Sequence, residues 1–176
     1  MGTTSMGREI PEATGASLEA FRGAWARAQG PSVQRKLLSA DRPSKVLSGI
    51  DEAIRRSGLE SGMTVSFHHH FREGDYLVNL VMDAIARAGI RDLTLASSSL
   101  TSVHAPLVAH CRSGVIRRIC SSGLRGKLAD EVSRGLLEEP VLIQSHGGRA
   151  RAVREGSLRP DVAFLGAPSC DPYGNA

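Results

Sequence analysis

Residues 62–70 read GMTVSFHHH, a short apolar run that follows a glycine and ends in three histidines. The apolar stretch at 63–67 has the length and composition of a buried strand rather than of a helix. Apolar residues at helical spacing precede it at 44–58 and follow it at 75–88. A strand between two helices is typical of a parallel sheet, because parallel neighbours need a long crossover connection.

The same alternation continues along the chain. Apolar runs predict further strands at residues 92–96, 115–120, 141–144 and 162–165, and helical spacing predicts helices at 105–112 and 127–137. Together these elements predict an α/β fold, a mostly parallel sheet with helices on both faces. Residues 1–43 lack the pattern and are expected to form a partly irregular N-terminal extension, so residues 44–176 are the expected α/β domain.

The two helices around the first strand carry detailed expectations. We expect Ser44 to cap the first helix and Gly58 to end it. Its predicted buried face comprises Val46, Leu47, Ile50, Ala53 and Ile54. The predicted buried face of the second helix comprises Leu77, Leu80, Val81, Ala84, Ile85 and Ala88.

Composition excludes several classes of protein. The chain has 176 residues, 4% aromatics and a net charge of +4. The charge is too small, and the aromatic content too low, to predict a nucleic-acid-binding surface. No stretch has the length and apolar character of a membrane span, and residues 1–30 have no signal-peptide pattern. Three cysteines without CxxC spacing argue against a disulfide framework and favour a reducing, cytoplasmic location.

Polar residues follow each predicted strand. These segments are 66–70, 97–99, 121–125, 145–149 and 167–175, and each is rich in Ser, Gly, His, Arg or Asn. Ligands of parallel α/β sheets bind beyond the carboxyl ends of the strands. The sequence therefore predicts a ligand site at this edge, and the string DPYGN at 171–175 predicts a turn there.

The first two segments offer histidine and serine side chains. His68 and His69 are candidates for substrate binding, and the alternative is a polar loop tip. No spacing of metal ligands accompanies them, so we predict no metal site. Ser98, in the triplet 97–99, is a candidate for binding phosphate or carboxylate, and the alternative is a simple strand-to-loop transition.

The next two segments offer arginines beside glycines. Arg125 is a candidate partner for an anion, but residues 112–127 carry five basic residues and no acid, so a solvated basic edge is the alternative. In the string SHGGR at 145–149, Gly147 and Gly148 are expected in a turn whose N–H groups face an oxyanion, with Arg149 on a carboxylate. The alternative is a tight turn without a ligand.

Several of these strings together resemble the citrate lyase alpha subunit family. They are GMTVSFHH at 62–69, DLTLASSS at 92–99, SGLRG at 122–126, SHGGR at 145–149 and FLGAPSCD at 164–171. The resemblance spans residues 44–176 and implies a CoA-transferase-like α/β fold. Members of the family are considerably longer, which implies that the chain is an N-terminal fragment and that catalytic residues lie outside it.

The resemblance also implies an activity. An alpha subunit of this kind exchanges citrate for the acetyl group of an acyl-carrier protein, giving citryl-carrier and acetate. The carrier, or gamma subunit, bears a CoA-like prosthetic group, so no cofactor is expected on this chain itself. A beta subunit, citryl-carrier lyase, then releases oxaloacetate within a hetero-oligomeric complex.

Chemistry at the predicted edge suits this activity. Citrate carries about three negative charges at neutral pH, because carboxyl groups titrate near 4. Arg149, Arg125 and a protonated His68 or His69 are expected to neutralise them, and N–H groups at Gly147, at Gly148 or after Phe67 to stabilise an oxyanion. Two alternatives stay open: a CoA-transferase for another carboxylate, and a non-catalytic binding or assembly module of the same fold.

Overall fold

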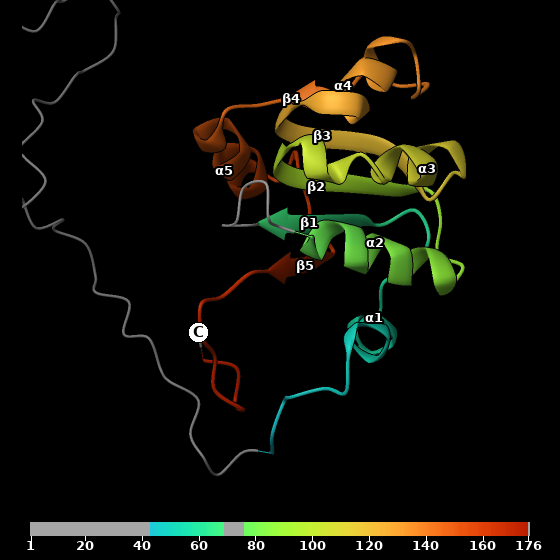
Figure 1. Cartoon of the computed structure of the whole chain (residues 1–176). Helices are drawn as coiled ribbons and strands as arrows, with labels where there is room; N and C mark the ends of the chain where they lie inside the picture. Colours follow the sequence, from blue (N-terminus) through green and yellow to red (C-terminus); the bar gives the residue numbers. More distant parts are fainter. Residues whose placement is uncertain (1–42, 69–75, 176) are drawn as a thin grey trace, which may run out of the picture. The chain divides into compact units, whose positions relative to one another are not determined.

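A computed structural model describes residues 43–68 and 76–175, in which strands and helices alternate (Figure 1). His69 and the N-terminal extension therefore lie outside the described residues. The strands are β1 (Thr64–His68), β2 (Leu93–Leu100), β3 (Ile116–Leu124), β4 (Leu142–Ile143) and β5 (Val162–Leu165). The helices are α1 (Ile50–Ser57), α2 (Leu77–Arg87), α3 (Leu107–Arg112), α4 (Gly126–Ser133) and α5 (His146–Glu155), with a short 3₁₀ helix η1 (Ser102–His104).

The described strands form one parallel sheet in the order β4-β3-β2-β1-β5. The chain steps outward from β1 to β4 and then returns to pair β5 with the free side of β1. Val65 therefore lies opposite Leu95 on one side and opposite Val162 on the other. The α/β fold with a parallel sheet and flanking helices is confirmed.

This strand order decides which helix covers which face. Crossovers in parallel sheets are right-handed, so a chain that reverses its direction across the sheet places the next helix on the opposite face. Helices α1 to α4 pack on one face, here called the core face, where α2 and α3 lie side by side (Figure 1). Helix α5 crosses back on the other side, here called the α5 face.

The two faces differ in size and in packing. Val65, Phe67 and Leu95 point into the core face, where they join apolar residues from α1 to α4, and Phe67 stacks on Phe164 with ring centroids 5.6 Å apart. The apolar cluster on the α5 face is small and comprises Ala96, Cys120, Ala152 and Leu158. The core therefore rests on one face, and the other keeps room for polar groups.

The first helix is shorter than the sequence predicted. It begins at Ile50, and Gly49 is its N-cap residue. Its C-cap is Gly58, as predicted, and this glycine adopts the left-handed conformation. The prediction that Ser44 caps it was wrong, because the Ser44 hydroxyl accepts the N–H of Val46 in a local turn. Val46 is exposed and lies outside the helix, so it adds nothing to the buried face.

The buried face of α2 is rotated from the predicted one. Leu80 is 54% exposed and Ala88 is also exposed, so both were wrongly assigned to the core. Val78 and Met82 are buried in their place. The helix packs on the sheet and also against α1 and α3, so its contact surface is broader than a single stripe.

Strands β2 and β3 extend further than the sequence predicted. They run to Leu100 and Leu124, so the serine segments at 97–99 and 121–123 are part of the strands rather than loops beyond them. Buried serines are tolerated there because some bond to the backbone of a neighbouring strand. The Ser121 hydroxyl, for example, donates to the carbonyl oxygen of Ser98 at 2.7 Å.

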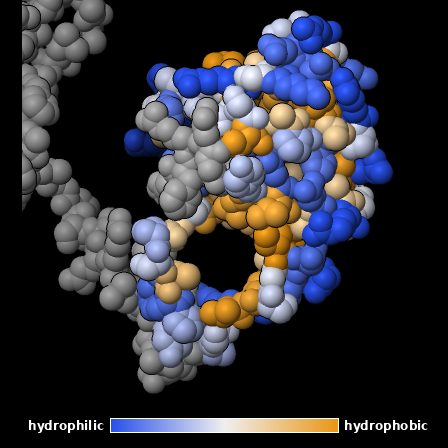
Figure 2. All heavy atoms as spheres, viewed as in Figure 1, coloured by the Kyte–Doolittle hydropathy of each residue, from blue (hydrophilic) through white to orange (hydrophobic). Residues whose placement is uncertain are grey.

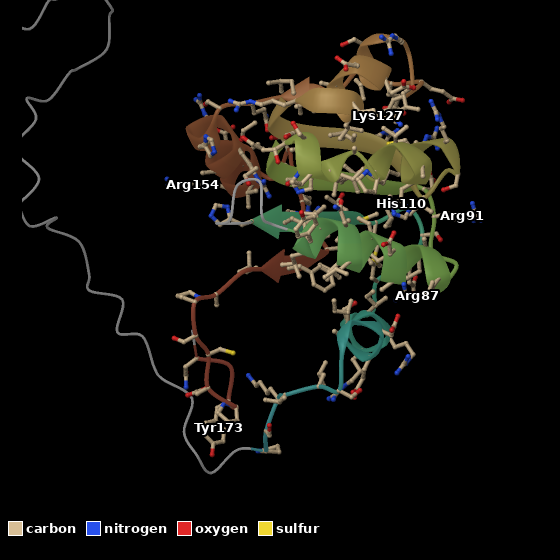
Figure 3. The ribbon with its side chains drawn as sticks, in the orientation of Figure 1. Arg87, Arg91, His110, Lys127, Arg154 and Tyr173 are labelled. Carbon is tan, nitrogen blue, oxygen red and sulfur yellow. The ribbon has the colours of Figure 1, made fainter. Side chains whose placement is uncertain are left out.

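The last described residues form the predicted turn. The Asp171 carboxylate accepts the N–H groups of Tyr173 and Asn175, both at 2.9 Å, and Tyr173 marks the turn in Figure 3. The N–H of Lys45 donates to the carbonyl oxygen of Pro172 at 2.7 Å, which ties the turn to the segment before α1. Figure 2 shows an opening with hydrophobic residues along part of its rim. In the described part of the chain, no helix is long and apolar enough to cross a membrane.

Candidate functional site

The strand order points to one place for a ligand. In open parallel sheets, ligands bind at the carboxyl ends of the strands where the strand order reverses. Here the reversal falls between β1 and β5, since β1 connects forward to β2 while β5 joins from the other side. We call the end of the sheet where the strands finish the carboxyl edge, and the end where they begin the amino edge.

The segment at 145–149 was predicted to form a turn after a strand. In the structure it forms the N-cap and first turn of helix α5. Ser145 caps the helix, and its hydroxyl accepts the N–H of Gly148 at 3.0 Å. Hydrogen bonding by the serine cap offsets part of the low helix propensity of the two glycines. The prediction that the Gly148 N–H faces a ligand is therefore wrong in this structure, because the cap already uses it. No acceptor for the Gly147 N–H is recorded among the described residues.

Arg149 points from α5 toward the ends of β1 and β2. Its Nη2 donates to the Ser66 hydroxyl at 2.7 Å, to the carbonyl oxygen of Ala96 at 3.1 Å and to that of Phe67 at 3.3 Å. All three acceptors are neutral. Its other terminal nitrogen, Nη1, is buried and has no hydrogen-bond partner among the described residues. One side of the guanidinium is thus fixed to the sheet and the other lacks an acceptor.

The charge of Arg149 has no acidic partner among the described residues. No ion pair is recorded for it within residues 43–68 and 76–175. Burial lowers the pKa of the guanidinium, and the neighbouring Cys120 thiol acts weakly in the opposite direction. A partly buried charge without a counter-charge is costly, which is why such charges are usually paired. The site therefore fits an anionic ligand.

Two other predicted residues lie on the same face and edge as Arg149. His68 follows Ser66 by two positions in β1, so both side chains point to the α5 face. Ser98 follows Ala96 by two positions in β2 and is buried. His68 is exposed at the end of its strand, opposite Leu165 of β5. The structure thus places His68, Ser98 and Arg149 at the carboxyl ends of β1 and β2, beside the reversal point.

Arg125 lies apart from this group. It precedes α4, which packs with α3 and η1 on the core face, and its side chain is exposed. Three other arginines of the basic stretch, Arg112, Arg117 and Arg118, pair with acidic residues from other parts of the chain. Arg117 pairs with Asp92 at 3.2 Å, and Arg118 forms two hydrogen bonds with Glu139 at 2.6 and 2.7 Å.

Sequence reasoning missed two residues at the site. Ser66 and Cys120 flank Ala96 in one row across the sheet, and this row faces α5. Burial raises the pKa of the Cys120 thiol, an effect that Arg149 partly offsets. The signal for Ser66 was a lone hydroxyl between Val65 and Phe67, at the strand position that alternation turns away from the core.

The described residues also define what the site lacks. No group of three or more His, Cys, Asp or Glu side chains within 43–68 and 76–175 is placed to hold a metal ion.

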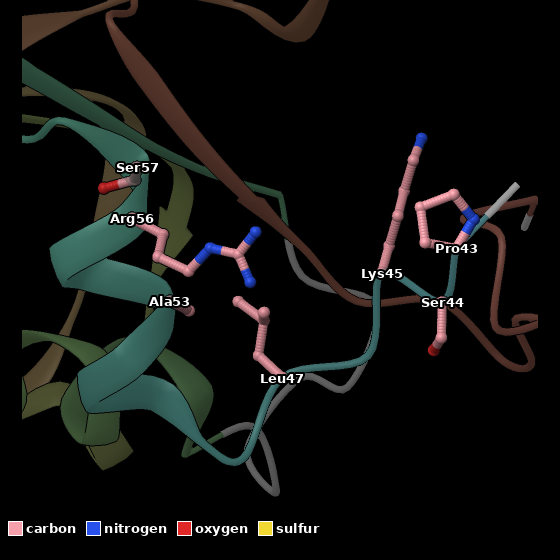
Figure 4. Close-up of a pocket in the computed structure, with 7 residues that line it drawn as sticks. All are labelled: Pro43, Ser44, Lys45, Leu47, Ala53, Arg56 and Ser57. Atoms are coloured by element: carbon pink, nitrogen blue, oxygen red, sulfur yellow. The ribbon is translucent and has the colours of Figure 1, made fainter.

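A separate hollow of about 610 Å³ lies between α1 and the segment before it (Figure 4). Its lining includes Pro43, Ser44, Lys45, Leu47, Ala53, Arg56 and Ser57. These residues lie on different elements from those around Arg149.

Comparison with known proteins places this chain in a family. The family model described as citrate lyase, alpha subunit, matches residues 43–176. The chain belongs to the citrate lyase alpha subunit family. It is similar to the citrate lyase alpha chain of Escherichia coli, with 64% identity over 135 residues, and to that of Haemophilus influenzae, with 60% identity over 132 residues.

A solved structure from Streptococcus mutans supports both fold and family. It is described as the alpha subunit of citrate lyase in complex with citrate, and it shares 54% identity with this chain at a TM-score of 0.75. The match covers 80% of this chain and 28% of that one. Against the curated citrate lyase alpha chains of E. coli and H. influenzae, the matches cover 77% and 75% of this chain and 26% of each relative. The chain therefore spans about a quarter of the length of these members of the citrate lyase alpha subunit family.

Proposed function

We propose that this chain forms part of a subunit that exchanges citrate for the acetyl group of an acyl-carrier protein. The observation that carries the proposal is the Arg149 guanidinium, which is partly buried, has no ion pair recorded among the described residues and lies at the carboxyl ends of β1 and β2, beside the reversal point of the sheet. A family member with 54% identity is described in complex with citrate, which supports a tricarboxylate as the anion.

The proposed reaction is an acyl exchange. A carboxylate oxygen of citrate attacks the carbonyl carbon of the acetyl thioester, and the carbon–sulfur bond breaks to give a mixed anhydride and the carrier thiolate. The thiolate then attacks the citryl carbonyl, forming the new thioester and releasing acetate. Each attack places negative charge on a carbonyl oxygen, which hydrogen-bond donors in a site of this kind stabilise.

Residues of this chain are assigned roles in binding. Arg149 offers Nη1 to one carboxylate of citrate, and Ser98 and His68 lie on the same face to contact the others. The Gly147 N–H, at the start of α5, is a backbone donor of the SHGGR segment with no acceptor recorded among the described residues, whereas the cap uses the N–H of Gly148. No nucleophile is assigned within the chain.

The proposal includes partners and a location. The carrier is a gamma-type subunit whose CoA-like arm holds the acetyl thioester, and a beta-type subunit cleaves the citryl product to oxaloacetate. Membership of the citrate lyase alpha subunit family supports both partners. A reducing cytoplasm is the proposed location, which the three free cysteines Cys111, Cys120 and Cys170 support.

An exchange assay tests the proposal. The polypeptide as its organism makes it is combined with its carrier and lyase partners, and release of acetate from labelled acetyl-carrier is followed against citrate concentration. We expect saturable release with citrate and little with succinate or acetoacetate. Equal release with those acids would indicate a transferase for another carboxylate. Citrate binding without any release would indicate a binding module instead.

A further inference from the structure

Ser66 lies in a position where a serine needs an explanation. It occupies the middle of β1, is 6% exposed, and stands between Val65 and Phe67, which point into the core. Burial of a hydroxyl is costly unless a hydrogen bond compensates it. The hydrogen bond recorded for this hydroxyl comes from Arg149 Nη2 at 2.7 Å, the shortest of the three at that nitrogen.

The three acceptors around Nη2 determine where the rest of the guanidinium points. Nη2 carries two hydrogens, and the Ser66 hydroxyl and two backbone carbonyl oxygens share them. A planar guanidinium held at one terminal nitrogen has its other nitrogen fixed as well. Because none of these acceptors is charged, they orient the guanidinium without neutralising it, and the buried Nη1 has no hydrogen-bond partner among the described residues.

We infer that Ser66 is a positioning residue, whose hydroxyl holds Arg149 so that Nη1 meets a carboxylate group of the bound substrate. This inference rests on the proposed function, since it takes citrate as the ligand of Arg149. Ser66 is the one side-chain acceptor of the three, so it is the one that a substitution removes. Without it, Nη2 keeps only the two longer bonds to Ala96 and Phe67, and the guanidinium gains freedom that citrate binding must then remove.

A double-mutant cycle tests whether Ser66 acts through Arg149. The polypeptide as its organism makes it, assembled with its partners, is prepared as Ser66→Ala, Arg149→Ala and the double variant. Citrate affinity is measured by calorimetry, and KM and kcat by the exchange assay. We expect Ser66→Ala to weaken citrate binding about fivefold, with kcat within about twofold of the unchanged protein. In the Arg149→Ala background the same change is expected to have no further effect.

Ser97→Ala is the matched control. Ser97 is also a buried serine in the interior of a central strand, but it faces the core and its hydroxyl has no hydrogen-bond partner among the described residues. We expect its loss to leave citrate affinity unchanged. Ser66→Cys, which keeps the side-chain volume and weakens the acceptor, replaces Ser66→Ala if that variant does not fold.

Each result has a separate meaning. If Arg149→Ala leaves citrate affinity unchanged, the site assigned in the proposed function is wrong, and the inference about Ser66 falls with it. If Arg149→Ala weakens citrate but Ser66→Ala does not, only the positioning role is overturned. Equal losses for Ser66→Ala in both backgrounds, or equal losses for Ser97→Ala, would also overturn it.

Discussion

Arginine is frequent at both edges of the sheet, but the two edges treat its charge differently. At the amino edge, Arg117 and Arg118 at the start of β3 pair with Asp92 and Glu139. Arg112, at the end of α3, pairs with Glu131 of α4. Arg87 and Arg91 lie at the same end of the molecule in Figure 3, and Arg87 pairs with Asp51.

At the carboxyl edge the arginines lack such partners in the part of the chain that the structure describes. No ion pair is recorded for Arg125 or Arg149 among the described residues. Arg125 is exposed, so water solvates its charge, whereas Arg149 is partly buried and bonds only to neutral oxygens. The arginines therefore divide into those with structural ion pairs at the amino edge and those at the carboxyl edge for which no ion pair is recorded among the described residues.

The largest expected effect concerns the backbone at the carboxyl edge. Gly126 has φ +62°, and a Cβ there would lie 3.1 Å from the Cα of Ser102. Gly126→Ala is expected to reduce the free energy of unfolding by about 3 kcal/mol, from left-handed strain and overpacking together. Gly135, after α4, has φ +90° and open space, so Gly135→Ala should cost about 1.5 kcal/mol. Urea unfolding measures both, and equal losses would show that the close approach of Ser102 does not matter.

The next effect separates the two kinds of arginine. Arg149→Ala is expected to weaken citrate binding by about 2 kcal/mol, or roughly thirtyfold, the loss typical of a hydrogen bond to a charged group. Arg118→Ala, at the amino edge, should leave citrate affinity unchanged. Calorimetric titration of the complete polypeptide measures both. A comparable loss for Arg118→Ala would mean that citrate responds to net charge rather than to a specific site.

A smaller effect is expected from the ion pairs of the amino edge. The Arg118 guanidinium holds the pKa of the Glu139 carboxyl below its usual range. Because the folded pKa is lowered, the stabilisation is present above the usual pKa of glutamate and is lost as the pH falls through the lowered value. Glu139→Gln should lower the melting temperature slightly at pH 7 and not at all below the folded pKa. Glu138→Gln is the control, because Glu138 is exposed and has no ion pair recorded among the described residues. This substitution should leave the melting temperature unchanged at either pH.

The smallest effect is a difference in thiol reactivity. Burial raises the pKa of Cys111 to about 11, whereas Cys170 is exposed. Alkylation at pH 8 followed by mass spectrometry should label Cys170 first and Cys111 only after unfolding. Citrate should slow the labelling of Cys120, which neighbours Arg149, without affecting Cys170. Equal protection of both thiols by citrate would argue against a ligand beside Arg149.

Much of the fold followed from local patterns. Strand β5 matches the predicted range at 162–165, and Gly58 ends α1 as its conformational freedom suggested. Differences arose where contacts between distant segments decide. Strands β2 and β3 lengthen through their serines because the two strands stay paired with each other as far as Leu100 and Leu124. The first turn of α5 forms over two glycines because Ser145 caps it and Arg149 anchors it to the sheet.

The candidate site was predictable only in part. Its edge followed from the general rule for parallel sheets, and Arg149, His68 and Ser98 were named from their positions after strands. Ser66 was not found, because nothing local shows that α5 crosses the face to which its side chain points. The separation of Arg125 from Arg149 was equally hidden, since the sequence does not show that α4 and α5 lie on opposite faces.

The return of β5 to the side of β1 also has a consequence for the time course of folding. Val65 pairs with Val162, so the sheet cannot close at this point until almost the whole described chain has been placed. Contacts of such long sequence separation form late, because the entropy of closing the loop opposes them until other contacts hold the ends together. The helix that carries Arg149 belongs to this last connection. A newly made chain should therefore gain its helices and its core before it can recognise an anion.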